Sequence, residues 1–63
     1  MYYVTKEEFE DVLSMDIQDK KKYLIENCGV KEIDLILDFL IYYDINGYLE
    51  SRIRQHVKVR SKL

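Results

Sequence analysis

Residues 31–45 read KEIDLILDFLIYYDI, and this stretch decides the fold. Its apolar positions recur at helical spacing, whereas Asp34 and Asp38 fall on the outer side of the same pattern. The stripe consists of Ile33, Ile36, Leu37, Leu40 and Tyr43. The spacing predicts a helix from Lys31 to about Ile45 that forms the central element of the core.

The same segment carries more apolar side chains than one helix face needs. Four further residues widen the stripe: Leu35, Phe39, Ile41 and Tyr42. A domain of 63 residues buries only about 60% of the surface that its unfolded chain exposes, so it has little core to offer. We therefore expect this helix to be covered by a partner or by a second copy of the chain, and a homodimer is one prediction.

Two helices are expected before residue 31. Thr5 can cap the first through its hydroxyl, with Glu8 three positions later, and Phe9, Val12 and Leu13 then lie on one face until about Met15. Ser14 or Asp16 can cap the second helix, which runs to Gly29. Gly29 is expected in the left-handed conformation that ends many helices.

The charged residues of the second helix suggest local pairs. Asp16 and Lys20, and Lys22 and Glu26, are four positions apart, a spacing that allows modest ion pairing along one helix.

The chain after Asn46-Gly47 allows two interpretations. Asn-Gly is a strong hairpin signal, and the residues past it alternate in polarity like a strand. Leu49, Ile53 and Val57 also fit one face of a fourth helix, which we favour. Residues 2–4, Tyr-Tyr-Val, form either a short strand paired with a C-terminal one or an aromatic lid.

The fold class expected from these elements is all-α. Residues 1–63 form one small domain of three to four helices, possibly with a winged-helix-like C-terminal β-hairpin.

Charge is divided along the chain although the formal net charge is only −2. All 12 acidic residues lie in residues 1–51, together with five of the 10 basic ones. Residues 52–63 form a basic segment without acids. Its basic residues are Arg52, Arg54, Lys58, Arg60 and Lys62. Such a segment attracts phosphate groups or an acidic surface.

Residues 29–52 resemble the second half of a winged helix-turn-helix domain. Cys28-Gly29-Val30 corresponds to the turn, and Leu40 and Tyr43 correspond to positions where the recognition helix faces its core. Residues 47–52, Gly-Tyr-Leu-Glu-Ser-Arg, correspond to the entry of the wing. The resemblance implies a DNA-binding transcriptional regulator that contacts phosphates through the basic segment.

The residue types needed for catalysis are sparse. One cysteine, Cys28, and one histidine, His56, do not make a metal site or a catalytic triad, and two glycines do not make a phosphate loop. We therefore expect no enzyme activity, no cofactor and no small-molecule substrate. A lone cysteine and the charged residues at positions 6–8 favour a cytoplasmic protein without a membrane segment.

The leading hypothesis is a small adaptor, inhibitor or regulator that binds another protein, of the kind that phages and mobile elements carry. Tyrosine is enriched where proteins meet, and the chain has six. The predicted protein-binding residues are Asp34, Asp38, Tyr42, Tyr43 and Tyr48. DNA binding through the basic segment is the alternative. The acids of residues 32–38 oppose it, because affinity for a duplex comes largely from cations near phosphates.

Overall fold

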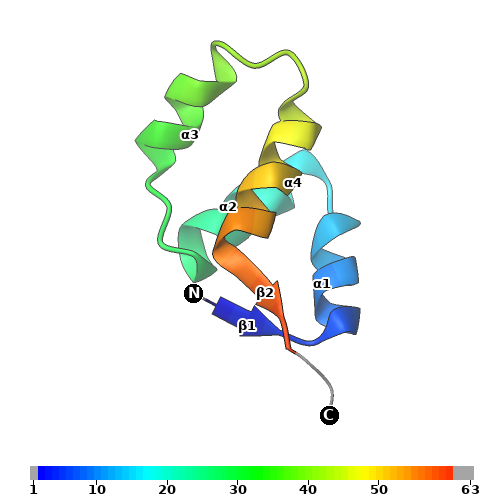
Figure 1. Cartoon of the computed structure of the whole chain (residues 1–63). Helices are drawn as coiled ribbons and strands as arrows, with labels where there is room; N and C mark the ends of the chain where they lie inside the picture. The colour runs from blue at the N-terminus through cyan, green and yellow to red at the C-terminus, as the bar shows by residue number, and fades with distance from the viewer. Residues whose placement is uncertain (1, 61–63) are drawn as a thin grey trace.

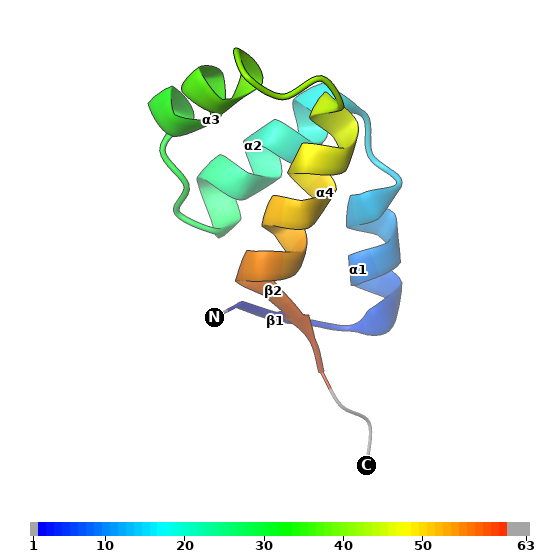
Figure 2. The ribbon, with the colours of Figure 1, turned by 45° about the horizontal axis from the view of Figure 1, so that its top comes forward.

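The computed structural model describes residues 2–60, which form four helices and two short strands. The elements are β1 (Tyr2–Val4), α1 (Lys6–Leu13), α2 (Ile17–Asn27), α3 (Glu32–Phe39), α4 (Ile45–His56) and β2 (Val57–Val59). Helices α2 and α4 pack against each other, and α1 and α3 lie on opposite sides of this pair (Figures 1 and 2). The predicted all-α class is confirmed. None of the helices in residues 2–60 has the length and apolar content needed to span a bilayer.

The first two helices begin and end where local sequence signals place them. Thr5 Oγ1 accepts the Glu8 N–H at 3.1 Å, and Asp16 Oδ1 accepts the Asp19 N–H at 2.8 Å. Gly29 has a φ of 71°, and after it the Val30 N–H donates to the Leu24 carbonyl at 3.1 Å. These capping predictions are confirmed, with Asp16 rather than Ser14 as the cap of α2.

Helix α4 begins at Ile45 and includes Asn46-Gly47, so the alternative prediction of a β-hairpin at this pair is wrong. Asp44 caps the helix by accepting the Gly47 N–H on Oδ1 at 2.8 Å, which places Asn46 and Gly47 in the first turn. A Cβ on residue 47 would lie 2.4 Å from Asp44 Oδ2. The glycine therefore permits close approach of the capping carboxylate, and it does not form a turn.

Strands β1 and β2, the first and last elements of the described residues, form a parallel pair. Val57 follows α4 directly and lies opposite Tyr2, and Val59 lies opposite Val4. The Arg60 N–H extends the pairing by donating to the Val4 carbonyl at 2.7 Å. The predicted pairing of residues 2–4 with a C-terminal strand is confirmed.

The core lies between α2 and α4 and continues to the strand pair. Leu49 and Ile53 are buried on the inner face of α4, as expected, whereas Val57 is buried but belongs to β2 rather than to the helix. The buried apolar residues are Val4, Val12, Tyr23, Leu24, Val30, Leu35, Tyr48, Leu49, Ile53 and Val57.

Helix α3 differs from its prediction in length and in orientation. It ends at Phe39 rather than near Ile45. The Leu40 and Ile41 N–H groups donate hydrogen bonds to the carbonyls of Leu37 and Asp38, three residues earlier, which ends the α-helical pattern. Leu35 is fully buried and Phe39 partly buried, whereas the stripe predicted to face the core is exposed. A single short helix at the side of the α2–α4 pair can bury only one narrow edge.

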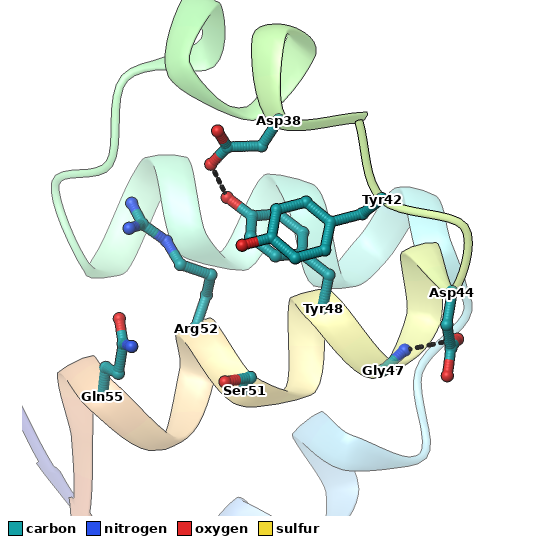
Figure 3. A pocket seen from close by; sticks show the side chains of 8 residues that line it. All are labelled: Asp38, Tyr42, Asp44, Gly47, Tyr48, Ser51, Arg52 and Gln55. Atoms are coloured by element: carbon teal, nitrogen blue, oxygen red, sulfur yellow. Dashed lines mark hydrogen bonds between the residues drawn. The ribbon is translucent and has the colours of Figure 1, made fainter. Parts of the chain in front are cut away.

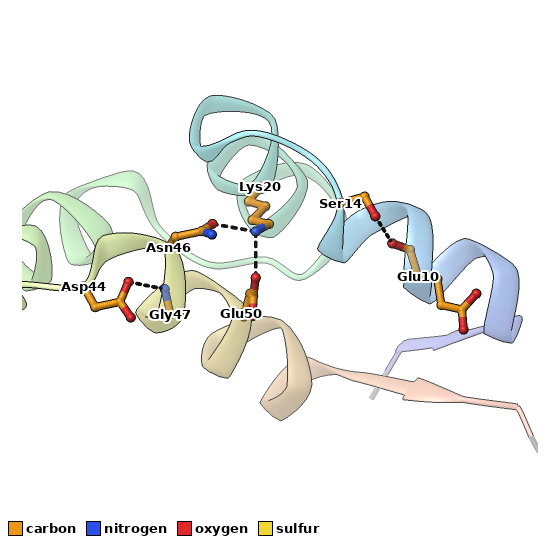
Figure 4. A network of polar contacts seen from close by, with 7 residues as sticks. All are labelled: Glu10, Ser14, Lys20, Asp44, Asn46, Gly47 and Glu50. Atoms are coloured by element: carbon orange, nitrogen blue, oxygen red, sulfur yellow. Dashed lines mark hydrogen bonds and ion pairs between the residues drawn. The ribbon is translucent and has the colours of Figure 1, made fainter.

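A lysine is the most buried charged residue of the described chain. The side chain of Lys20 is 1% exposed, and its Nζ donates to Asn46 Oδ1 at 2.5 Å and to Glu50 Oε2 at 3.0 Å (Figure 4). Sequence spacing suggested Asp16 as the partner of Lys20. The structure shows instead that this ammonium group connects α2 to α4.

Leu35→Ala and Leu37→Ala test the orientation of α3. Leu35 is fully buried, so its truncation is expected to lower the free energy of unfolding by about 2–4 kcal/mol. Leu37 is 53% exposed, and its truncation should change stability by less than about 0.5 kcal/mol. Urea denaturation monitored by circular dichroism measures both; equal losses would contradict this orientation.

Glu50→Ala tests the role of the buried ammonium group. The substitution leaves Lys20 buried with only Asn46 as an acceptor, so we expect a loss of about 1–3 kcal/mol. Lys20→Met in the Glu50→Ala background should recover much of this loss, because it removes the buried charge. Glu26→Ala is the control, since Glu26 is an exposed acid on α2. If Glu50→Ala and Glu26→Ala were equivalent in urea denaturation, the contact would not matter for stability.

Candidate protein-binding surface

The outer side of α3 and the loop after it expose a group of large apolar side chains. Leu40 is 77% exposed, and Tyr43 is fully exposed. We call this group the α3 face, and it consists of Ile33, Ile36, Leu37, Leu40, Ile41 and Tyr43. Monomeric soluble proteins rarely expose contiguous apolar patches of this kind outside binding sites.

Acidic residues border the α3 face. Asp34 is exposed on α3, and Glu32 lies at its first turn, where Glu32 Oε2 is 3.5 Å from Lys21 Nζ. Asp44 is exposed in the loop before α4. Between residues 31 and 44 the chain carries four acids, and Lys31 is the only basic residue. The surroundings of the α3 face are therefore negatively charged.

The three tyrosines predicted to bind a partner occupy different environments. Tyr43 is fully exposed and Tyr42 is half exposed. Tyr48 is also a predicted binding residue, but it is only 9% exposed and belongs to the core. Tyr42 covers it, with the two rings stacked at a centroid distance of 4.5 Å.

Asp38, the other predicted binding residue besides Asp34, is fixed by Tyr48. The Tyr48 hydroxyl donates to the Asp38 carboxylate, which joins α4 to the end of α3 (Figure 3). Phe39 adds an edge-to-face contact with the Tyr48 ring at 6.1 Å. These contacts hold the end of α3 and the following loop over α4.

The environment of Tyr48 disfavours its ionised form. Burial, and secondly the hydrogen bond to Asp38, raise the pKa of Tyr48 to about 12. The neutral phenol is therefore the form that holds Asp38 throughout the physiological range.

A cleft of about 390 Å³ opens between this loop and α4. Arg52 lies at one end and Asp44 at the other, with Tyr42 and Tyr48 between them (Figure 3). The sequence placed Arg52 in the basic segment and gave no indication of a cleft. The available signal was that Arg52 is four positions from Tyr48. Residues at this spacing lie on one side of a helix, so the two side chains could be expected to lie close together.

The predicted nucleic-acid residues do not form one continuous strip. Arg52 is half buried beside the cleft, whereas Arg54 is exposed and lies over the Phe9 ring, 5.9 Å from its centroid. Lys58 and Arg60 are exposed at the strand pair, and Lys62 lies outside the described residues. Arg52 and Arg54 thus lie in different surroundings, one at the cleft and one at α1.

The winged-helix resemblance fails at the wing. Residues 47–52, which correspond to the wing entry, lie inside α4. Gly29 does form the turn between α2 and α3, as expected. The helix at the recognition position is α3, and its acids would face phosphates. The sequence matches no protein-family model, and neither the curated proteins nor the solved structures compared with it gave a match.

The described residues offer little for metal or thiol chemistry. Within residues 2–60 no group of three or more His, Cys, Asp or Glu side chains is placed to hold a metal ion. Cys28 is half buried, and burial raises the pKa of its thiol. The thiol is therefore protonated near neutral pH, where it is a poor nucleophile.

Tyr48→Phe tests the hydrogen bond to Asp38 through its pH dependence. The pKa of Tyr48 rises from 10.0 in the unfolded chain to about 12 in the folded one. This raised pKa stabilises the fold below pH 10, and the contribution is lost as pH rises through 12. Tyr48→Phe should lower stability at pH 8, and the difference from wild type should shrink between about pH 10 and 12. Urea denaturation at each pH measures it; a constant difference would contradict the assignment.

Proposed function

We propose that this protein is a small regulatory or adaptor protein that binds another protein through the α3 face. The observation that carries the proposal is the exposure of six large apolar side chains on one short helix and its loop. Burying apolar surface contributes about 25 cal/mol per Å², so these residues add favourable free energy only when a partner covers them. Tyr43 adds a large, rigid contact with a polar end, which is typical of interface hot spots.

The charge around the α3 face indicates the chemistry of the partner. The acids at positions 32, 34, 38 and 44 border the apolar residues. A complementary surface has apolar side chains at its centre and lysine or arginine at its edge. The same acids disfavour a nucleic-acid duplex, and an anionic membrane surface, as the occupant.

A second copy of the chain is a poorer fit to this surface. A homodimer formed by two α3 faces would bring both sets of acids together, and in each copy Lys31 and the Lys21 that pairs with Glu32 compensate them only in part. Like charges placed opposite each other at an interface oppose association. A different protein with a basic edge avoids this repulsion.

A selection from random peptides tests the proposal and needs no identified partner. Peptides of 15 residues, displayed with free carboxyl termini, are selected on the wild-type protein and counter-selected on an Ile36→Ser/Leu40→Ser variant. This variant keeps every charge and both changes are exposed, so its unfolding should match that of the wild type. We expect enriched peptides with apolar residues every three to four positions and an excess of Lys and Arg.

Two further measurements separate the possible occupants. Asp34→Lys should slow the association of an enriched peptide, as measured by surface plasmon resonance, because it reverses charge at the edge of the face. Sedimentation equilibrium tests the second copy. Micromolar dimers that the Ile36→Ser/Leu40→Ser variant abolishes would assign the face to self-association. Peptides that bind both proteins equally would overturn the proposal.

A further inference from the structure

The cleft beside the α3 face contains an arginine that has no acceptor among residues 2–60. Arg52 Nε is buried and donates no hydrogen bond, and the guanidinium group makes no ion pair within this part of the chain. Its side chain extends from α4 on the same side as the Tyr48 hydroxyl and the Asp38 carboxylate (Figure 3). Buried donors in folded proteins nearly always have an acceptor, so this arrangement needs a physical explanation.

The nearby acids do not supply that acceptor. Asp38 lines the same cleft, but its carboxylate accepts the Tyr48 hydroxyl, and it lies beyond ion-pair distance from Arg52. Asp44 caps the N-terminus of α4 by accepting a hydrogen bond from the Gly47 N–H. The cleft of about 390 Å³ is therefore lined by Arg52 and by two acids, Asp38 and Asp44, neither of which forms an ion pair with Arg52.

The geometry points to a carboxylate of the bound partner as the missing acceptor, and we propose that the cleft is a carboxylate-binding subsite of the interface. The planar guanidinium group carries five donors in a fork that matches a carboxylate. Ser51 and Gln55 also line the cleft and add polar groups that can hydrogen-bond. Tyr42 lines the cleft and belongs to the loop that continues the α3 face, so one partner segment can reach both. The inference rests on the proposed function.

The charge distribution along the cleft favours a carboxylate over a phosphate. Asp44 and Arg52 are eight positions apart, which at the rise of a helix is roughly 12 Å and exceeds a Debye length of about 8 Å. One end of the cleft is therefore negative and the other positive. Asp38 lies beside the positive end, and it repels a dianion more strongly than a monoanion. A carboxylate at Arg52 and a basic residue near Asp44 would also fix the direction of the bound segment.

The experiment uses the peptides enriched by the selection on the α3 face. We expect each high-affinity peptide to contain Asp or Glu, or to depend on its free terminal carboxylate. Arg52→Gln should weaken binding about tenfold or more, the loss expected for one hydrogen-bonded charge pair. Arg54→Gln is the matched control, because it removes the same charge two positions away, outside the cleft. Isothermal titration calorimetry measures the affinities.

A double-mutant cycle makes the result independent of any damage to the protein. Replacing the peptide's Glu by Gln should weaken binding to the wild type as much as Arg52→Gln does, and the two changes together should add little. Peptide amides compared with free acids distinguish a terminal carboxylate from a side-chain carboxylate, and loss with either one supports the subsite.

Three outcomes would overturn the inference, and they are distinguishable. Peptides that need the α3 face but bind Arg52→Gln as tightly as the wild type would exclude the subsite and leave the proposed function intact. Tighter binding of a peptide with phosphoserine in place of Glu would assign the cleft to a phosphate instead. Failure to select any peptide that needs the α3 face would remove the proposed function and the subsite together.

Discussion

The buried ammonium group of Lys20 is the contact on which the arrangement of the helices depends. It has two acceptors, Asn46 and Glu50, and both belong to α4. A buried charge is tolerated only where its partners are in place, so α2 and α4 have one register in which this contact forms. That register places Tyr48 and Arg52 on the side of α4 that faces α3. The cleft and the position of the α3 face both follow from it.

A lysine in a small core has a cost that apolar packing would avoid. Well-packed apolar residues often equal or exceed a buried ion pair in stability. Contacts between smooth aliphatic side chains, however, permit neighbouring registers, whereas hydrogen bonds to one ammonium group do not. The buried apolar side chains of α2 and α4 include Leu24, Leu49 and Ile53. We infer that Lys20 adds specificity to the packing of α2 against α4.

Local signals in the sequence predicted most helix ends, and long-range contacts explain the errors. Thr5, Asp16 and Gly29 act on backbone groups within a few residues, so their patterns were sufficient. Asn46-Gly47 was ambiguous because this pair is typical of a hairpin turn, whereas here Asp44 caps a helix that includes both residues in its first turn. For α3, apolar residues occupy most of the helix circumference, and periodicity alone cannot tell its buried edge from its exposed face. Among the candidate site residues, Asp34 is exposed as expected. Tyr43 is exposed although the helical spacing placed it in the core-facing stripe, and the burial of Tyr48 depends on Tyr42 and Phe39.

The sequence of α3 is strongly apolar because apolar residues occupy both its inner edge, which packs on the rest of the domain, and the exposed α3 face. Leu35 and Phe39 attach the helix to the body, and the Tyr48–Asp38 hydrogen bond holds its end. An isolated helix of eight residues is unstable in water, and no side chain caps the N-terminus of α3. The few inner contacts therefore keep α3 folded, while the exposed parts of the apolar residues on its outer side contribute little to the stability of the isolated domain. Their exposure costs solubility without adding stability, and only binding to a partner turns that surface into favourable free energy.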